Sequence, residues 1–211
     1  MTWRNDHLAY DWFPRPLPEN IRLGPNVYIE TSYIFAAFYS AMQPGLEMEE
    51  GSGAYALTCI ATGPQAAIKV GAYTCLNGGS LIADDAIDIG AHCLLAWGSV
   101  VTDPITPRPG EVARRRRALM DVANDPSRRL PSIVDAKPVH IADNVWVGFD
   151  AVITGGVSIG RGAVIGCKAV ITENIPQYAV AVGNPCRIVR YLEPDDGEDV
   201  RMAALGEFGL V

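Results

Sequence analysis

Histidine is scarce in this sequence, with only three residues, at positions 7, 92 and 140. A catalytic metal site built from three converging histidines is therefore not expected, since only His92 and His140 lie in the patterned part of the chain. Five cysteines, an odd number without CxxC spacing, argue against a disulfide framework or a zinc site. We therefore expect no metal cofactor.

Long apolar runs are also missing, because no stretch of about 18 such residues occurs. The N-terminal residues MTWRNDHLAYDWFPRP contain no apolar signal core, so we expect a cytoplasmic protein that does not enter a membrane. The net charge of −7 disfavours nucleic acid as a partner. A chain of 211 residues, 49% of them hydrophobic, can form one domain with a sizeable core.

The strongest pattern is a period of six residues. One aliphatic residue returns at every sixth position from Ile141 onward: Ile141, Val147, Ile153, Ile159, Ile165 and Ile171. Neither a helix nor an ordinary strand generates this period. A fixed hexad indicates stacked identical turns, hence a parallel β-helix whose core forms only between neighbouring coils. The residue after each aliphatic is small (Ala142, Gly148, Thr154, Gly160, Gly166 and Thr172), and we expect this slot to lie in a turn, often at positive φ.

The same rhythm runs earlier in the chain, where Met48, Ala54 and Ile60 are also six apart. Two insertions interrupt it, at about 34–45 and 104–138. The predicted organisation is a single domain with an N-terminal arm (1–20), a first β-helix part (21–103), a basic insertion (104–138), a second β-helix part (139–189) and a C-terminal tail (190–211).

The second insertion differs from the rest of the chain in charge. It has eight basic and four acidic residues, a net charge of +4, which leaves −11 for the remainder. Residues 111–123 are predicted to be helical, after Pro109-Gly110 and before Asp125-Pro126. Two interpretations are open: a solvated helix that docks on an acidic neighbour, or a basic lid over an anionic ligand.

The segment PVHIADNVWVGFDAVITGGVSIGRGAVIGCKAVITENIPQYAVAVGNPCRIVR (138–190) strongly resembles the hexapeptide-repeat acyltransferases. It is most similar to the maltose and galactoside O-acetyltransferase branch and to the xenobiotic acetyltransferases. The resemblance implies an all-β fold, a left-handed parallel β-helix of hexapeptide repeats with a partly helical loop insertion and a short C-terminal tail. It also implies a homotrimer that binds acetyl-CoA, or another acyl-CoA, between two adjacent β-helices.

The resemblance assigns cofactor-binding roles to individual residues. Trp146 matches a tryptophan that lines the CoA and acceptor cleft, although it would also fill a trimer seam. Four residues fall where the family's backbone contacts the pantetheine arm, or simply where the turns need small residues: Gly148, Ala151, Gly166 and Cys167. At the nucleotide end the matching residues are Thr172, Arg187 and Arg190, with Lys168 as compensation for Glu173, which replaces a family lysine.

The acceptor side is implied in the same way. Asn77 matches an asparagine beside the reacting groups, and Asp84 and Asp85 match an acidic pair that binds acceptor hydroxyls. Turn geometry alone would also explain all three residues.

One departure concerns the catalytic base. The family's histidine falls at Thr106 in the stretch TDPITP (102–107), and a threonine hydroxyl cannot act as a base near neutral pH. The repeat register puts Ile89, Ile141 and Ile159 at equivalent positions, so the insertion should leave after Thr106 and return just before Ile141, with Thr106 and His140 facing each other across its neck. His140 is then a candidate replacement base; the alternative is a half-exposed histidine on a strand.

Two functions follow from these residues. The first is CoA-dependent acyl transfer to a hydroxyl or amine of a small molecule or sugar, with His140, Asn77 and Thr106 as candidate catalytic positions. The second is a β-helical binding or scaffold protein that has lost catalysis, which Thr106 and Glu173 favour.

Overall fold

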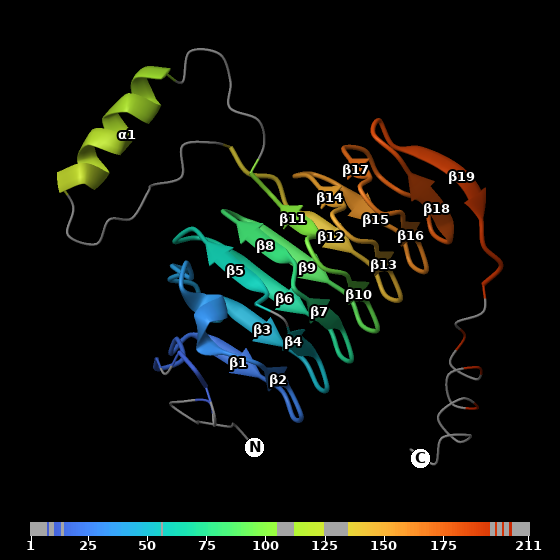
Figure 1. Ribbon diagram of the computed structural model, residues 1–211, viewed down its shortest axis with the longest axis horizontal. Coiled ribbons are helices and arrows are strands. Elements are labelled where there is room, and N and C mark those ends of the chain that lie inside the picture. Colours follow the sequence, from blue (N-terminus) through green and yellow to red (C-terminus); the bar gives the residue numbers. More distant parts are fainter. Residues whose placement is uncertain are drawn as a thin grey trace.

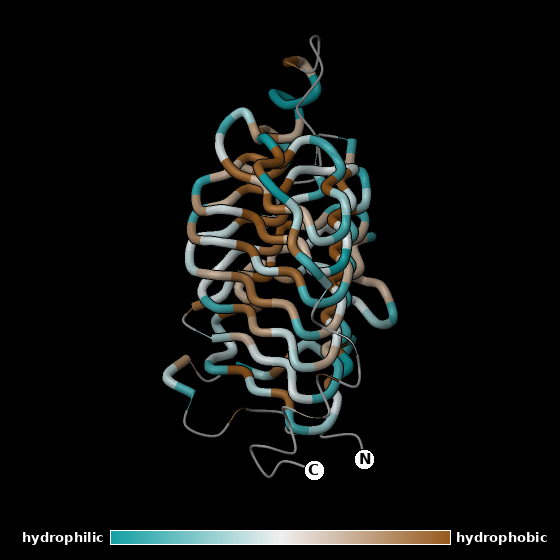
Figure 2. The backbone as a smooth tube through the Cα atoms, turned by 90° about the vertical axis from the view of Figure 1, so that its right-hand side faces the viewer, coloured by the Kyte–Doolittle hydropathy of each residue, from teal (hydrophilic) through white to brown (hydrophobic). Residues whose placement is uncertain are grey.

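The computed structural model describes residues 8, 11–13, 15–55, 57–104, 112–124, 135–194, 197, 200 and 203. Short strands wind around a common axis and stack into a three-sided column (Figure 1). This is the predicted left-handed parallel β-helix, and helix α1 (Val112–Asn124) lies outside it. Figure 2 shows the coils lying one above another along the column.

Each side of the column is one sheet. Sheet A contains β1 (Ile21–Leu23), β3 (Leu46–Met48), β6 (Ala67–Val70), β9 (Ala86–Ile89), β12 (Val139–Ile141) and β15 (Ser158–Ile159). Sheet B contains β2 (Tyr28–Ile29), β4 (Gly53–Tyr55), β7 (Cys75–Asn77), β10 (Leu94–Leu95), β13 (Trp146–Val147), β16 (Val164–Ile165), β18 (Ala179–Val182) and β19 (Arg187–Tyr191). Sheet C contains β5 (Cys59–Thr62), β8 (Ser80–Ala83), β11 (Val100–Thr102), β14 (Val152–Ile153) and β17 (Val170–Ile171).

The sheets meet at three edges that run the length of the column. We call them the AB edge (71–74, 90–93, 142–145, 160–163), the BC edge (78–79, 96–99, 148–151, 166–169) and the CA edge (84–85, 103, 154–157, 172–174). In the first coil the 3₁₀ helix η1 (Ser32–Phe35) follows β2 where later coils have a strand of sheet C. Strands pair in parallel, except that β19 returns antiparallel to β18.

The hexad aliphatics form the core, as predicted. All six, from Ile141 to Ile171, are buried, and so are Met48, Ala54 and Ile60 of the earlier rhythm. The predicted register is also confirmed, since Ile141 pairs with Ile89 on one side and Ile159 on the other.

The prediction of positive φ at the small-residue slot is wrong. Positive φ falls two residues later, at Asn144, Asp150, Gly156, Gly162 and Lys168. Near Asn77, likewise, the positive φ belongs to Gly78. The slot needs a small residue because adjacent coils approach closely: a Cβ on Gly148 would lie 2.8 Å from the backbone nitrogen of Cys167.

The outer faces of the sheets differ in chemistry. One register row of sheet A is polar or charged throughout: Arg22, Glu47, Lys69, Asp88, His140 and Ser158. The corresponding row of sheet B is largely apolar: Tyr28, Gly53, Cys75, Leu94, Trp146, Val164 and Val180. The outer face of sheet A is thus suited to contact with solvent, and the outer face of sheet B is suited to contact with another protein surface.

The second insertion leaves the column at the CA edge. An antiparallel bridge between Pro104 and Ala136 closes its neck, and helix α1 (Val112–Asn124) stands away from the coils (Figure 1). The predicted helix is confirmed over 112–123, while Glu111 lies outside the described residues.

Candidate functional site

A ladder of backbone hydrogen bonds organises the BC edge. The Gly98 N–H donates to the Gly78 carbonyl at 3.0 Å, and the Asp150 N–H donates to the Trp97 carbonyl at 3.0 Å. The Lys168 N–H then donates to the Phe149 carbonyl at 2.8 Å. The ladder therefore sets Gly78, Trp97, Phe149 and Cys167 at equivalent positions of successive coils, at a spacing of about 4.8 Å each, with Asn77 directly before Gly78.

Aromatic side chains cover the middle of this edge. Trp97 is 54% exposed and Phe149 46%, with ring centroids 6.1 Å apart. Trp146 is 49% exposed on the neighbouring outer face of sheet B. The sequence analysis identified Trp146 but missed Trp97 and Phe149. Their signal was a bulky aromatic directly before a positive-φ residue, Gly98 or Asp150, in a corner where side chains point outward.

Cations gather at the last coils of the same edge. Lys168 occupies a positive-φ corner, and Arg187 lies opposite Val182 at the start of β19. Arg187 is exposed and donates through Nη1 to the Cys186 carbonyl at 2.6 Å. Arg190, also exposed, pairs in register with Val180. An exposed aromatic strip that ends in cations fits an elongated ligand with an apolar arm and a phosphorylated end.

The small residues predicted to touch this ligand have structural roles. A Cβ on Gly166 would lie 2.7 Å from the Val182 side chain, so glycine is needed there for coil packing. Ala151 is fully buried, its N–H donates to the Gly148 carbonyl and its own carbonyl accepts from Val100. Cys167, by contrast, is an exposed free thiol.

The acidic pair lies at the CA edge, on the other side of sheet C. The N–H groups of Asp84 and Asp85 donate to the two carboxylate oxygens of Asp103, at 2.7 and 2.8 Å. Asp103 is fully buried. Burial raises the pKa of its carboxyl, the two N–H donors lower it, and the charges of Asp84 and Asp85 raise it again, to about 6.

Asp103 was not predicted from the sequence as a site residue. Asp103 directly follows Thr102, which pairs with Ile82, so it occupies a position that points into the core. An ionisable residue at an inward position was the signal in the sequence. The preceding coils place Ala83 and Thr62 there, both buried.

His140 projects from the outer face of sheet A. It pairs with Asp88 in the register of β9 and β12, and its side chain is 59% exposed. The N–H of Lys137 donates to the Asp103 carbonyl at 3.0 Å, so the neck of the insertion closes just before His140. Thr106 lies outside the described residues.

Within one chain, the predicted site residues therefore lie in three separate places. Asn77, Trp146, Cys167, Lys168 and Arg187 lie on sheet B or at the BC edge. Asp84, Asp85 and the exposed Thr172 lie at the CA edge, and His140 lies on sheet A. All of these residues can line one cleft only if a second copy of the chain contributes.

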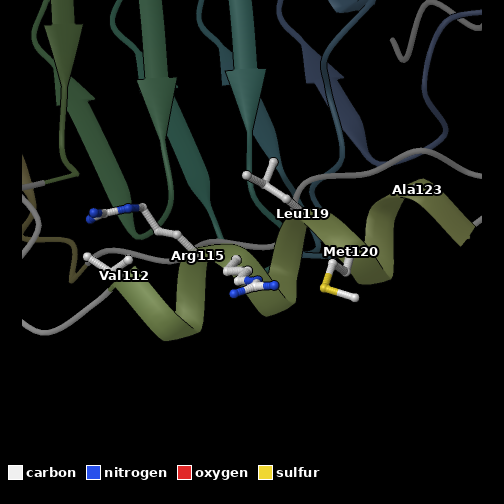
Figure 3. Close-up of a pocket in the computed structure, with 6 residues that line it drawn as sticks. Val112, Arg115, Leu119, Met120 and Ala123 are labelled. Atoms are coloured by element: carbon white, nitrogen blue, oxygen red, sulfur yellow. The ribbon is translucent and has the colours of Figure 1, made fainter.

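A separate pocket of about 470 Å³ lies along α1. Val112, Arg115, Leu119 and Met120 line it (Figure 3). It contains none of the predicted site residues, so it does not alter the assignment above.

Comparison with known proteins supports the repeats and the fold. Residues 138–173 match the family model described as bacterial transferase hexapeptide (six repeats). A stretch of 60 residues is similar to the putative acetyltransferase SACOL2570 of Staphylococcus aureus (strain COL), with 47% identity. That match covers 28% of this chain and 30% of the relative, so it spans under a third of either protein.

Two solved structures share the fold over most of the chain. A hexapeptide-repeat-containing acetyltransferase of Vibrio cholerae O1 biovar eltor, complexed with acetyl coenzyme A, has 23% identity and a TM-score of 0.56, covering 76% of this chain and 75% of its own. A mutant of AntD, an N-acyltransferase from Bacillus cereus in complex with dTDP and coenzyme A, has 16% identity and a TM-score of 0.58, covering 90% and 88%. Hexapeptide repeats are therefore shown over residues 138–173, and the resemblance to the hexapeptide-repeat acetyltransferases is confirmed.

No helix in the described part of the chain is long and apolar enough to cross a membrane.

Proposed function

We propose that this protein is a cytoplasmic, homotrimeric, CoA-dependent acyltransferase that moves an acetyl group to a hydroxyl or amine of a small molecule. The observation that carries the proposal is the BC edge, where an exposed aromatic strip ends in Lys168 and Arg187. The acetyltransferase descriptions of the similar proteins support the same chemistry.

The BC edge supplies the binding site for the donor. Trp97, Phe149 and Trp146 offer apolar surface to the pantetheine arm, and the cations at the far end pair with its phosphates. Asn77 lies three coil steps away from Cys167, about 14 Å along the ladder. Its amide is then at the thioester end, where an N–H donor stabilises the negative charge that develops on the carbonyl oxygen.

The acceptor is held by Asp84 and Asp85 of a neighbouring copy. Its oxygen or nitrogen attacks the thioester carbonyl, the carbon–sulfur bond breaks, and the acceptor proton passes to His140 and on to the departing thiolate. The separation of these residues within one chain supports an active site shared between subunits. The apolar outer row of sheet B, against the charged row of sheet A, supports sheet B as a subunit contact.

Release of free thiol from acetyl-CoA, followed with DTNB over a panel of amines and sugars, tests this function. We expect thiol release that depends on both protein and acceptor. Absence of turnover with the whole panel would instead favour a β-helical binding protein without catalysis.

A further inference from the structure

A buried acidic side chain lies at the neck of the second insertion. Asp103 occupies the inward slot of the CA edge in which the two preceding coils have Ala83 and Thr62. A fully buried carboxylate is costly unless hydrogen bonds satisfy it. The role of Asp103 therefore has to be sought in the bonds that it makes.

Asp103 ties two parts of the protein together. Its side chain accepts the N–H groups of Asp84 and Asp85, one on each oxygen, and so holds the turn of the preceding coil. Its main chain holds the neck, because its carbonyl accepts from Lys137 beside the bridge between Pro104 and Ala136.

The coil itself does not require a carboxylate in this slot. Thr62 occupies the equivalent slot, and its Oγ1 accepts the N–H groups of Tyr39 and Ser40 at 2.8 and 2.9 Å. A neutral hydroxyl thus captures two donors there, whereas Asp103 places a charge beside the carboxylates of Asp84 and Asp85, which raise its pKa. Two separate oxygens fix two N–H directions independently, which one shared oxygen cannot do.

The direction of Asp84 is fixed from a second side. A Cβ at Gly63, in the turn of the coil below, would collide with the Oδ1 atom of Asp84. The Asp84 side chain therefore lies over the bare backbone of Gly63, while Asp85 stays exposed. Asp103 from the following coil and Gly63 from the preceding coil together orient the acidic pair.

We propose that Asp103 is a positioning residue of the acceptor site, which fixes the directions of Asp84 and Asp85 and ties their turn to the neck of the insertion. The acceptor part of this inference rests on the proposed acyltransfer function. Asp103 is buried, so it acts on the acceptor only through the turn.

An activity-independent experiment tests the hydrogen-bonded clamp. In ¹⁵N TROSY spectra recorded between pH 4 and 8, the amide protons of Asp84 and Asp85 should shift together with a midpoint of about 6. Among the described residues, the charges of Asp84 and Asp85 act on Asp103, and Lys137 bonds to its carbonyl through the main chain, so the same titration in an Asp84→Asn, Asp85→Asn protein identifies the origin of the shift. The transition should persist in that protein and vanish in Asp103→Asn; persistence in Asp103→Asn would overturn the clamp.

Steady-state kinetics test the positioning role. Asp103→Asn should raise the acceptor KM about tenfold or more, the effect of losing charge-assisted hydrogen bonds, with kcat and the acetyl-CoA KM within about twofold. In the Asp84→Asn, Asp85→Asn background the same change should cost less than about twofold, because the side chains through which Asp103 acts are gone. An equal increase in the acceptor KM in both backgrounds would mean that Asp103 has only a structural role.

Asp103→Thr is a second variant that tests the proposal if Asp103→Asn fails to fold. It copies the arrangement of Thr62, so its thermal midpoint should stay near that of the natural protein while the acceptor KM rises. A folded Asp103→Thr protein with an unchanged acceptor KM would refute the proposal. If the natural protein acylates no acceptor, the proposed function and the acceptor role fall together, and the clamp is still decided by the amide titration.

Discussion

The Nδ1 atom of His140 lies 3.9 Å from the Oδ2 atom of Asp88, across the strand pair of β9 and β12 on the outer face of sheet A. Both side chains are more than half exposed, so this pair contributes little to stability. An imidazole that is exposed and beside a carboxylate is free to exchange protons with a bound acceptor.

His140→Ala should therefore lower turnover by about 10²-fold or more while leaving CoA affinity unchanged, since general-base help is worth about that much. Thr106→His in the His140→Ala background should restore part of the rate. DTNB assays and CoA titrations measure these effects.

His92→Ala is the matched control for that series. His92 lies at the AB edge, where its ring stacks on Tyr73 at a centroid distance of 5.4 Å, away from the neck of the insertion. It should keep normal turnover. If His140→Ala is as active as His92→Ala, the acceptor reacts without this base, as a neutral amine can.

Arg187→Glu should weaken CoA more than pantetheine, because the residue is assigned to the phosphates alone. Loss of a charge-assisted contact plus repulsion should reduce CoA affinity by about tenfold or more. Isothermal titration with both ligands measures the difference. Arg22→Glu, a charge reversal on sheet A where Arg22 pairs with Glu47, should affect neither ligand; equal losses for CoA and pantetheine at Arg187 would contradict the assignment.

The β-helix was predictable from the sequence because one steric rule repeats in every coil. Each hexad aliphatic, such as Ile159, must point inward, and the aliphatic residue two positions before each of Ile89, Ile141 and Ile159 fixes the register across the insertion. The position of positive φ was not predictable in the same way: small residues such as Gly148 are required by contact between coils, which is a tertiary effect.

The candidate site was only partly predictable for a related reason. Trp146 and Arg187 stand within a dense motif, whereas Asp103 looks like any acid in a turn until its partners in the preceding coil are known. Its partners lie 18 and 19 residues earlier, so the hydrogen bonds become visible only once the coils are stacked.

Ile159→Asp should prevent folding. Ile159 is 2% exposed in the narrow core, and an unpaired buried carboxylate costs several kcal/mol, roughly the stability of a whole domain. Its neighbour Ser158 is exposed on the same strand, so Ser158→Asp should fold normally. Circular dichroism and thermal melts compare the two; a cooperative, natural-like melt for Ile159→Asp would show that the register is wrong.

Leu94→Glu combined with Val164→Glu should convert the proposed trimer to monomers. Both residues pair with Trp146 in the apolar outer row of sheet B, the surface proposed as the subunit contact, and neither is fully buried in the single chain. Light scattering should show a trimer for the natural protein and for Ser158→Asp. A natural protein that is monomeric at micromolar concentration would exclude the shared active site.

Asp11 holds the N-terminal arm and should make stability respond to strong acid. Its carboxylate accepts from the Thr31 hydroxyl at 2.7 Å and from the Ser32 N–H at 2.8 Å. Partial burial raises its pKa, but these hydrogen bonds and one from Phe13 outweigh that effect and lower it to about 2. The stabilisation is therefore complete above the ordinary value of 3.8 and is lost only as the pH falls through about 2.

Asp103 should have the opposite effect on stability at mild acidity. Its pKa is raised from 3.8 to about 6, so between these values the folded state binds more protons than the unfolded state, and the free energy of unfolding increases as the pH falls. Urea unfolding at pH 7 and at pH 4.5 should therefore show the natural protein gaining roughly 1–3 kcal/mol relative to Asp103→Asn on acidification. Asp11→Ala should lower the free energy of unfolding equally at both pH values, because Asp11 stays ionised at each. A difference between the natural protein and Asp103→Asn that does not change with pH would mean that the Asp103 carboxyl titrates at the same pH in the folded and unfolded chains.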